Sequence, residues 1–130
     1  MKIFGIGTDI INIKRMEKSI IKNGISFKNK IFSPKEIIYC ERKKNPSSFY
    51  AKRFAAKEAL SKALGTGIAK GVNFKDIEVS NNKQGKPSIY LKGNTAKYLK
   101  NKIKNKKYYI HLSLSDDEPW AQATVIISYK

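Results

Sequence analysis

The strongest helix signal in the chain is FYAKRFAAKEALSKAL, residues 49–64. Alanine, lysine, leucine and glutamate dominate it, and all four favour the helical state. One stripe of this helix is apolar and predicts the face that packs on the core: Ala56, Leu60, Ala63 and Leu64. Another face carries Glu58 and the residues spaced −4, +3, +4 and +7 from it: Phe54, Ser61, Lys62 and Gly65. We therefore expect one long helix with a core face and a polar face, ended by the glycine.

Upstream of this helix the sequence predicts a strand and a first helix. Residues 3–11 are apolar and β-branched, which is typical of a strand. A helix is expected over residues 12–23, where Gly24 stops it. Its apolar positions recur at helical spacing and predict the buried stripe Ile13, Met16, Ile20 and Ile21.

A second helix begins at a capping box. Ser33 and Glu36 have the spacing of that motif, and Pro34 occupies the first helical position. This helix is expected to end near residue 42 or 43. The chain then breaks at residues 45–48, and a serine there is expected to cap the long helix.

Downstream of Gly67 the sequence becomes strand-like. Residues 77–80 and 88–91 predict a hairpin, and a Lys-rich helix is expected near residues 94–102. Two long strands follow at residues 109–115 and 121–129. A strand, several helices and then mostly strands predict a single α+β domain over residues 1–130. Its largely antiparallel sheet is expected to pack against the long helix.

Composition limits the class of protein. Among 130 residues, 27 are Lys or Arg and 10 are Asp or Glu, which gives a net charge of +17. This charge predicts affinity for polyanions, although a base-composition bias in the coding DNA also produces a chain rich in Lys, Ile and Asn. A single cysteine, Cys40, excludes an intrachain disulfide and a zinc ribbon. No run approaches the ~18 apolar residues of a membrane span, so we expect a soluble cytoplasmic protein.

Two acidic residues are candidate metal ligands. Asp9 interrupts the apolar pattern near the end of the first strand, and it is either an acid stabilised at the start of the following helix or a ligand. Glu58 is either half of an ordinary i,i+4 ion pair with Lys62 or a second ligand. Carboxylates brought together from a strand end and a helix form a hard-oxygen site, which suits Mg²⁺ completed by substrate phosphates.

Two motifs resemble those of the 4′-phosphopantetheinyl transferases. Residues 6–9, IGTD, resemble the G-x-D motif of that family, and residues 54–62, FAAKEALSK, resemble its K-E-A/S-x-x-K motif. The continuation at residues 63–68 resembles the small bacterial holo-acyl-carrier-protein synthases. So does the C-terminal pattern at residues 110–125, so the resemblance spans the whole chain.

This resemblance implies a reaction, a metal and an assembly. Members of the family transfer the 4′-phosphopantetheine arm of coenzyme A to a serine of an acidic apo acyl carrier protein, release adenosine 3′,5′-bisphosphate and support fatty acid biosynthesis. Carried over by position, Asp9 and Glu58 are the implied Mg²⁺ ligands. The small members also form homotrimers with the coenzyme between neighbouring subunits.

Further residues have candidate roles in binding the coenzyme: Arg53, Ser61, Lys62, Gly65, Gly67 and His111. Lys62 is one turn beyond Glu58 and is also a candidate catalytic cation at the phosphates. Arg53 is expected to pair with a phosphate, the 3′-phosphate in particular, and the alternative is a solvated helix residue. The glycines and the serine are expected to allow close approach of the ligand.

The base that takes the serine proton is left open. Asp116 is one candidate, a Mg²⁺-bound water is another, and an acidic turn without a catalytic role is the third interpretation. The carrier protein is expected to dock on one exposed side of the first helix, formed by Lys14, Arg15, Lys18 and Lys22. The alternative for that side is an ordinary solvated lysine face.

Two other functions compete with this interpretation. A non-catalytic RNA- or DNA-binding protein would use the charge together with stacking on Tyr98, Tyr108 and Tyr109. Scarce arginine and the lack of a recognised nucleic-acid motif count against it. An adaptor for acidic partners would have no use for Asp9 and Glu58 as a pair. The sequence does not define which carrier proteins are accepted or whether acylated coenzyme A is used.

Overall fold

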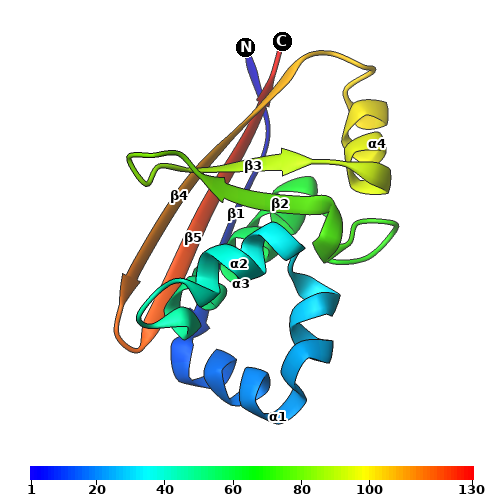
Figure 1. Ribbon diagram of the computed structural model, residues 1–130. Coiled ribbons are helices and arrows are strands. Elements are labelled where there is room, and N and C mark those ends of the chain that lie inside the picture. Colours follow the sequence, from blue (N-terminus) through cyan, green and yellow to red (C-terminus); the bar gives the residue numbers. More distant parts are fainter.

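A long helix packs between two antiparallel sheets in the computed structural model, which describes residues 1–130 (Figure 1). The larger sheet has the order β1-β5-β4, from β1 (Lys2–Asn12), β4 (Tyr108–Asp117) and β5 (Trp120–Tyr129). The smaller sheet is the hairpin of β2 (Ile77–Asn81) and β3 (Pro87–Leu91). In Figure 1 the hairpin crosses the long strands, and the two termini lie together at one end. The predicted α+β class with antiparallel sheets is confirmed.

Four helices and one short 3₁₀ turn complete the chain. They are α1 (Ile13–Ile31), α2 (Pro34–Glu41), α3 (Pro46–Leu64), the turn η1 (Phe74–Asp76) and α4 (Gly93–Lys102). Helix α3 contributes buried alanines and leucines to the main core, together with β2, β3, α4 and β5. Its predicted core stripe is therefore correct. None of the four helices combines the length and the apolar character that crossing a bilayer requires.

Small residues let strand β1 lie directly on α3. A Cβ atom added to Gly7 would meet the Ala59 carbonyl oxygen at 1.9 Å, and one added to Gly5 would meet the Ala63 carbonyl oxygen at the same distance. Real Cβ atoms do not approach backbone this closely, so only glycine fits at both positions. The close packing fixes the height of β1 on the helix, and with it the position of every side chain that β1 directs toward α3.

The first helix departs from the prediction. Gly24, with non-helical φ 58° and ψ −142°, interrupts the helix where the sequence predicted its end, but a second helical segment follows at once and continues α1 to Ile31. Figure 1 shows the result as two arms that meet at a bend. Ile13 and Met16 are buried as predicted, whereas Ile21 is 77% exposed. The kink turns the middle of α1 outward, so that it packs on the body through its start and its end.

Helix termini were predicted with mixed success. The capping box of Ser33 and Glu36 is present, and Gly65 ends α3 in the left-handed conformation. No serine caps α3: its N-cap is Asn45, without a side-chain bond, and the Ser48 hydroxyl donates back to the Asn45 carbonyl. Pro46 at the first helical position has no N–H, which reduces the need for a cap.

Candidate active site

Asp9 and Glu58 line the same cleft, as the sequence predicted for a pair of carboxylates. The cleft has a volume of about 380 Å³ and lies between β1, the two arms of α1, and α3. Arg15 and Asn12 contribute polar atoms to it. The rest of the lining includes an apolar group of side chains: Ile11, Met16, Phe27, Phe54 and Trp120.

The G-x-D motif has a direct structural reason. Gly7 faces α3, where no larger residue fits. Side chains two positions apart on a strand share a face, so Asp9 faces α3 as well. Its register partner on β5 is the buried Ala123, which confirms that face. The glycine thus brings the strand close enough to the helix for the aspartate to reach the side chains of α3.

Only one of the two carboxylates in this cleft has a cation within 4.0 Å. Lys62 lies 3.0 Å from the Asp9 carboxylate and also donates to the Thr8 carbonyl, so the alternative of an ordinary Glu58–Lys62 ion pair is wrong. Glu58 has no cation within 4.0 Å. Burial raises the pKa of Glu58 above its usual value, the charge of Asp9 raises it further, and Lys62 opposes the shift. Two carboxylates therefore share one lysine.

This donor set fits Mg²⁺. The two carboxylates come from rigid elements, and no third His, Cys, Asp or Glu joins them in a cluster. Mg²⁺ is commonly held by one or two carboxylates while waters and substrate phosphate oxygens complete its coordination. A divalent cation would also supply the positive charge that Glu58 lacks.

Arg53 lies in a second cavity, on a different side of α3. It is 2% exposed, so the alternative of a solvated residue is wrong. Its guanidinium stacks 4.0 Å from the Tyr39 ring centre and donates to Asn81 Oδ1 at 2.6 Å, whereas its Nε is buried without a partner. The adjoining cavity of about 290 Å³ is also lined by Lys52 and Gly85. A buried guanidinium with an unused donor beside a lysine suits an anionic group.

The turn after α3 offers an open surface but few free donors. The Ser61 hydroxyl is buried and donates to the Glu58 carbonyl at 2.6 Å. The N–H groups of Gly65 and Gly67 donate to the carbonyls of Lys62 and Ser61. Both glycines have positive φ, and a Cβ at either would meet no atom within 4 Å. A ligand can therefore approach this backbone closely, although these two N–H groups are already used.

His111 and Asp116 do not join the carboxylate pair within one chain. His111 is opposite Ile126 on the sheet face turned away from α3, and its Nε2 lies 3.1 Å from the Ser128 hydroxyl. Asp116 pairs with Lys52 at 3.1 Å. The middle strand β5 separates it from β1, a distance of roughly two strand spacings, or 9–10 Å.

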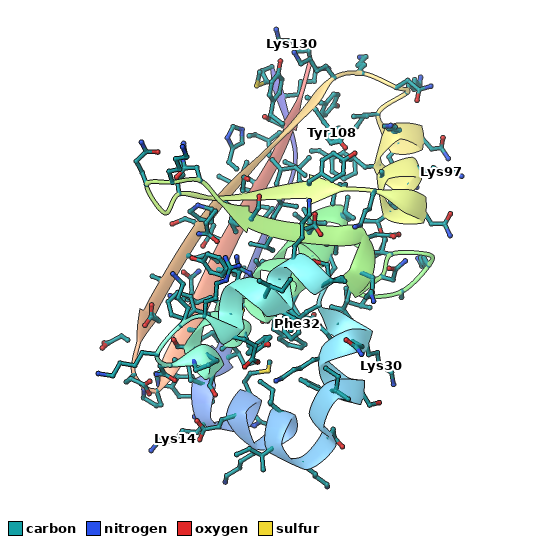
Figure 2. The ribbon with its side chains drawn as sticks, in the orientation of Figure 1. Lys14, Lys30, Phe32, Lys97, Tyr108 and Lys130 are labelled. Atoms are coloured by element: carbon teal, nitrogen blue, oxygen red, sulfur yellow. The ribbon has the colours of Figure 1, made fainter.

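The four predicted docking residues all lie exposed on the first arm of α1: Lys14, Arg15, Lys18 and Lys22. Arg15 also lines the cleft of the two carboxylates. Figure 2 labels Lys14 at the edge of the molecule, at the start of this arm. A partner on this face would therefore reach the cleft directly.

Sequence reasoning missed two features of the site. Phe27 and Trp120 belong to the cleft because the second arm of α1 and the start of β5 fold against it. Lys57, inside the helix motif, is fully buried and pairs with Glu36. Its place at the start of the K-E-A/S-x-x-K motif and its position beside the core residue Ala56 were the only signals. The lone Cys40 is also buried, and burial raises the pKa of its thiol to about 12, which makes it a poor nucleophile.

The chain is similar to known proteins over most of its length. Residues 5–124 match the family model described as the 4′-phosphopantetheinyl transferase superfamily. Over 126 residues the chain is 47% identical to the holo-[acyl-carrier-protein] synthase of Cereibacter sphaeroides, covering 96% of this chain and 92% of that protein. It is 49% identical over 126 residues to the protein of the same name in Rhizobium rhizogenes, covering 96% and 94%.

Solved structures are similar over nearly the whole chain. The holo-[acyl-carrier-protein] synthase of Neisseria meningitidis superposes with a TM-score of 0.85 at 36% identity, covering 97% of this chain and 98% of that one. The Helicobacter pylori synthase, solved in complex with coenzyme A, gives a TM-score of 0.82 at 37% identity, covering 95% and 99%.

Proposed function

The chain belongs to the 4′-phosphopantetheinyl transferase superfamily, and we propose that it transfers the 4′-phosphopantetheine arm of coenzyme A to a serine of an apo acyl carrier protein. The observation that carries this proposal is the cleft in which the family's two motifs meet, with Asp9 from the first and Glu58 from the second. The proposed acceptors include a carrier protein of fatty acid biosynthesis.

Asp9 and Glu58 hold Mg²⁺ in this proposal, and the ion would supply positive charge at the pyrophosphate of coenzyme A. Lys62 adds a second positive charge. Its side chain is about half exposed and bonds only to Asp9 and Thr8, so it is free to turn toward a phosphate oxygen. Its charge favours the step in which the bond from the pantetheine phosphorus to the leaving nucleotide breaks.

The acceptor in the reaction is the serine hydroxyl of the carrier. A bond forms from the serine oxygen to the pantetheine phosphorus, the bond from that phosphorus to the oxygen of the nucleotide breaks so that adenosine 3′,5′-bisphosphate leaves, and the serine proton passes to the solvent. Asp116 is not assigned the role of base here, because it bonds to Lys52 and lies across β5 from Asp9.

The coenzyme site is proposed to be shared between subunits of a homotrimer. Arg53 and His111 are both expected to bind the coenzyme, yet neither lines the cleft of Asp9 and Glu58. The sheet face that carries His111 has no helix over it and exposes Ile6 and Ile10 at 63% and 62%. A neighbouring subunit on this face would cover the isoleucines and complete the site. Light scattering should give a trimer, and a monomer at active concentrations would refute this assembly.

Mass spectrometry of the carrier tests the proposed function. The protein is incubated with coenzyme A, Mg²⁺ and several apo carrier proteins, and with the same carriers bearing alanine in place of the acceptor serine. We expect the serine carriers to gain the mass of one 4′-phosphopantetheine group and the alanine carriers to gain nothing. Unmodified serine carriers throughout would contradict the proposal.

A further inference from the structure

Lys57 is the one charged residue of the helix motif to which the proposed reaction gives no role. It precedes Glu58 on α3 but is directed away from the cleft, and its side chain is fully buried. Its ammonium donates to the Ile31 carbonyl at 2.9 Å, to the Phe74 carbonyl at 3.0 Å and to Glu36 Oε1 at 2.7 Å. All three ammonium donors are used, since lysine has three and no acceptor.

Glu36 completes this buried network. Its Oε1 also accepts from the Ser33 N–H, and its Oε2 accepts from the Val79 N–H. Burial lowers the pKa of the Lys57 ammonium, and the adjacent Glu36 carboxylate opposes that shift. One lysine and one glutamate thereby join the end of α1, the start of α2, η1, β2 and the middle of α3.

Two of the three groups that Lys57 binds support the apolar wall of the cleft. Ile31 ends the second arm of α1, one turn after Phe27, which lines the cleft. Phe74 stacks on Phe54, another lining residue, with ring centres 5.4 Å apart. Figure 2 labels Phe32, the residue after Ile31, in the interior of the protein. The ammonium also complements the partial negative charge at the end of α1.

We propose that Lys57 is a positioning residue, which holds the second arm of α1, and with it Phe27, at a fixed distance from the side of the cleft formed by Asp9 and by Phe54 and Glu58 of α3. An apolar side chain at position 57 fills the volume but takes the ammonium donor from the buried Ile31 carbonyl and leaves the Phe74 carbonyl with only the Ile77 N–H, so the second arm of α1 shifts. The carrier and its serine then meet a cleft of the wrong width. The role rests on the proposed function, because it assumes that the carrier serine enters this cleft.

Four variants separate positioning from folding. The bonds from the Lys57 ammonium to the Ile31 and Phe74 carbonyls are called the clamp. Lys57→Met removes the clamp and leaves Glu36 buried without its cation. Lys57→Met/Glu36→Gln removes that unpaired charge but still lacks the clamp, whereas Glu36→Gln alone keeps Lys57 on both carbonyls. The matched control is Lys75→Met, since Lys75 donates to the Asn29 carbonyl of the same arm from an exposed position on η1.

Urea unfolding and steady-state kinetics are measured on each variant. We expect Lys57→Met to be the least stable, and the double variant to recover much of the stability but not the activity. Its kcat/KM for the carrier should fall about tenfold or more, because small misplacements near the reacting groups slow catalysis strongly, while KM for coenzyme A stays within about twofold. Glu36→Gln and Lys75→Met should keep kcat/KM for the carrier within about threefold. A double variant with parental kcat/KM for the carrier would overturn the proposal. A loss of kcat/KM in Glu36→Gln as large as that in the double variant would also overturn it.

Hydrogen exchange on the parent protein needs no variant and no reaction. If the clamp holds the second arm of α1, the amides of residues 29–32, which can donate to carbonyls within this arm, exchange only through global unfolding. Exchange of this arm by local fraying would overturn the proposal even if every variant failed to fold. A parent protein that modifies no carrier but protects this arm would refute the proposed function and leave the clamp intact.

Discussion

Helix α3 carries two clusters of charge on different sides, and they are built in opposite ways. The interior cluster, Lys57 with Glu36, is fully buried, and each charged atom has a partner at 3.0 Å or less. The cleft cluster contains Asp9, Glu58 and Lys62, is partly exposed, and leaves Glu58 without a cation.

This difference distinguishes a cluster that stabilises the fold from a cluster that is a candidate site for a ligand. A buried charge is tolerated only where hydrogen bonds and an opposite charge satisfy it, and the interior cluster meets that condition. The cleft cluster does not, since two carboxylates share one lysine and the pKa of Glu58 is raised. Groups left with such unmet interactions are candidates for binding a ligand. The four predictions below test this contrast.

The largest expected effect is on folding. Lys57→Met should lower the free energy of unfolding by about 3–5 kcal/mol, because it leaves Glu36 as an unpaired buried charge. Lys62→Met, five residues later on the same helix, should cost about 1 kcal/mol or less, since its side chain is half exposed. Urea unfolding in EDTA measures both. If Lys57→Met and Lys62→Met lowered the free energy of unfolding by similar amounts, the proposed distinction between the two clusters would be wrong.

Substitutions in the cleft cluster should have their main effect on catalysis rather than on stability. Asp9→Asn and Glu58→Gln should each reduce kcat/KM about a hundredfold at limiting Mg²⁺, which corresponds to about 2.7 kcal/mol. Their far-UV circular dichroism should match that of the parent. Asp117→Asn, an exposed acid at the end of β4, is the control and should retain activity. Parental kcat/KM in both ligand variants would refute the metal assignment.

Charge reversal on α1 should affect the carrier alone. We propose that an acidic carrier protein docks on α1. Reversing Arg15 and Lys18 to glutamate should then raise the apparent KM for the carrier about tenfold at low salt, with little change for coenzyme A. The matched control reverses Lys100 and Lys104, exposed lysines at the end of α4 and just beyond it. An equal effect in the control would show that net charge, rather than α1, attracts the carrier.

The smallest effect is a gain in stability. A raised carboxyl pKa means that the folded state binds the Glu58 proton more tightly than the unfolded state, so ionised Glu58 destabilises the metal-free fold at neutral pH. Glu58→Gln should therefore raise the Tm in EDTA by about 1–3 °C. This advantage should shrink as the pH falls toward the usual glutamate pKa of about 4.3. A Tm below that of the parent for Glu58→Gln at neutral pH would contradict the claim that ionised Glu58 destabilises the metal-free fold.

Local sequence signals predicted most of the fold. Propensity and spacing were enough for α3, the capping box of Ser33 and the hairpin, because each depends on neighbouring residues. The exposure of Ile21 was not predictable, since it follows from the way the kinked α1 meets the rest of the fold. The motifs led to Asp9 and Glu58. They could not reveal the burial of Lys57, which depends on Glu36, 21 residues earlier.

The central claim is that the cleft cluster, in which Glu58 has no paired cation, binds a divalent cation, and that the fully paired interior cluster does not contribute to this binding. Mn²⁺, used in place of Mg²⁺, can be titrated into the protein with coenzyme A present and followed by electron paramagnetic resonance. The parent and Lys57→Met/Glu36→Gln should each bind one Mn²⁺ per chain with similar affinity, whereas Glu58→Gln should bind it about tenfold or more weakly. Equal affinity in Glu58→Gln and the parent would contradict the claim.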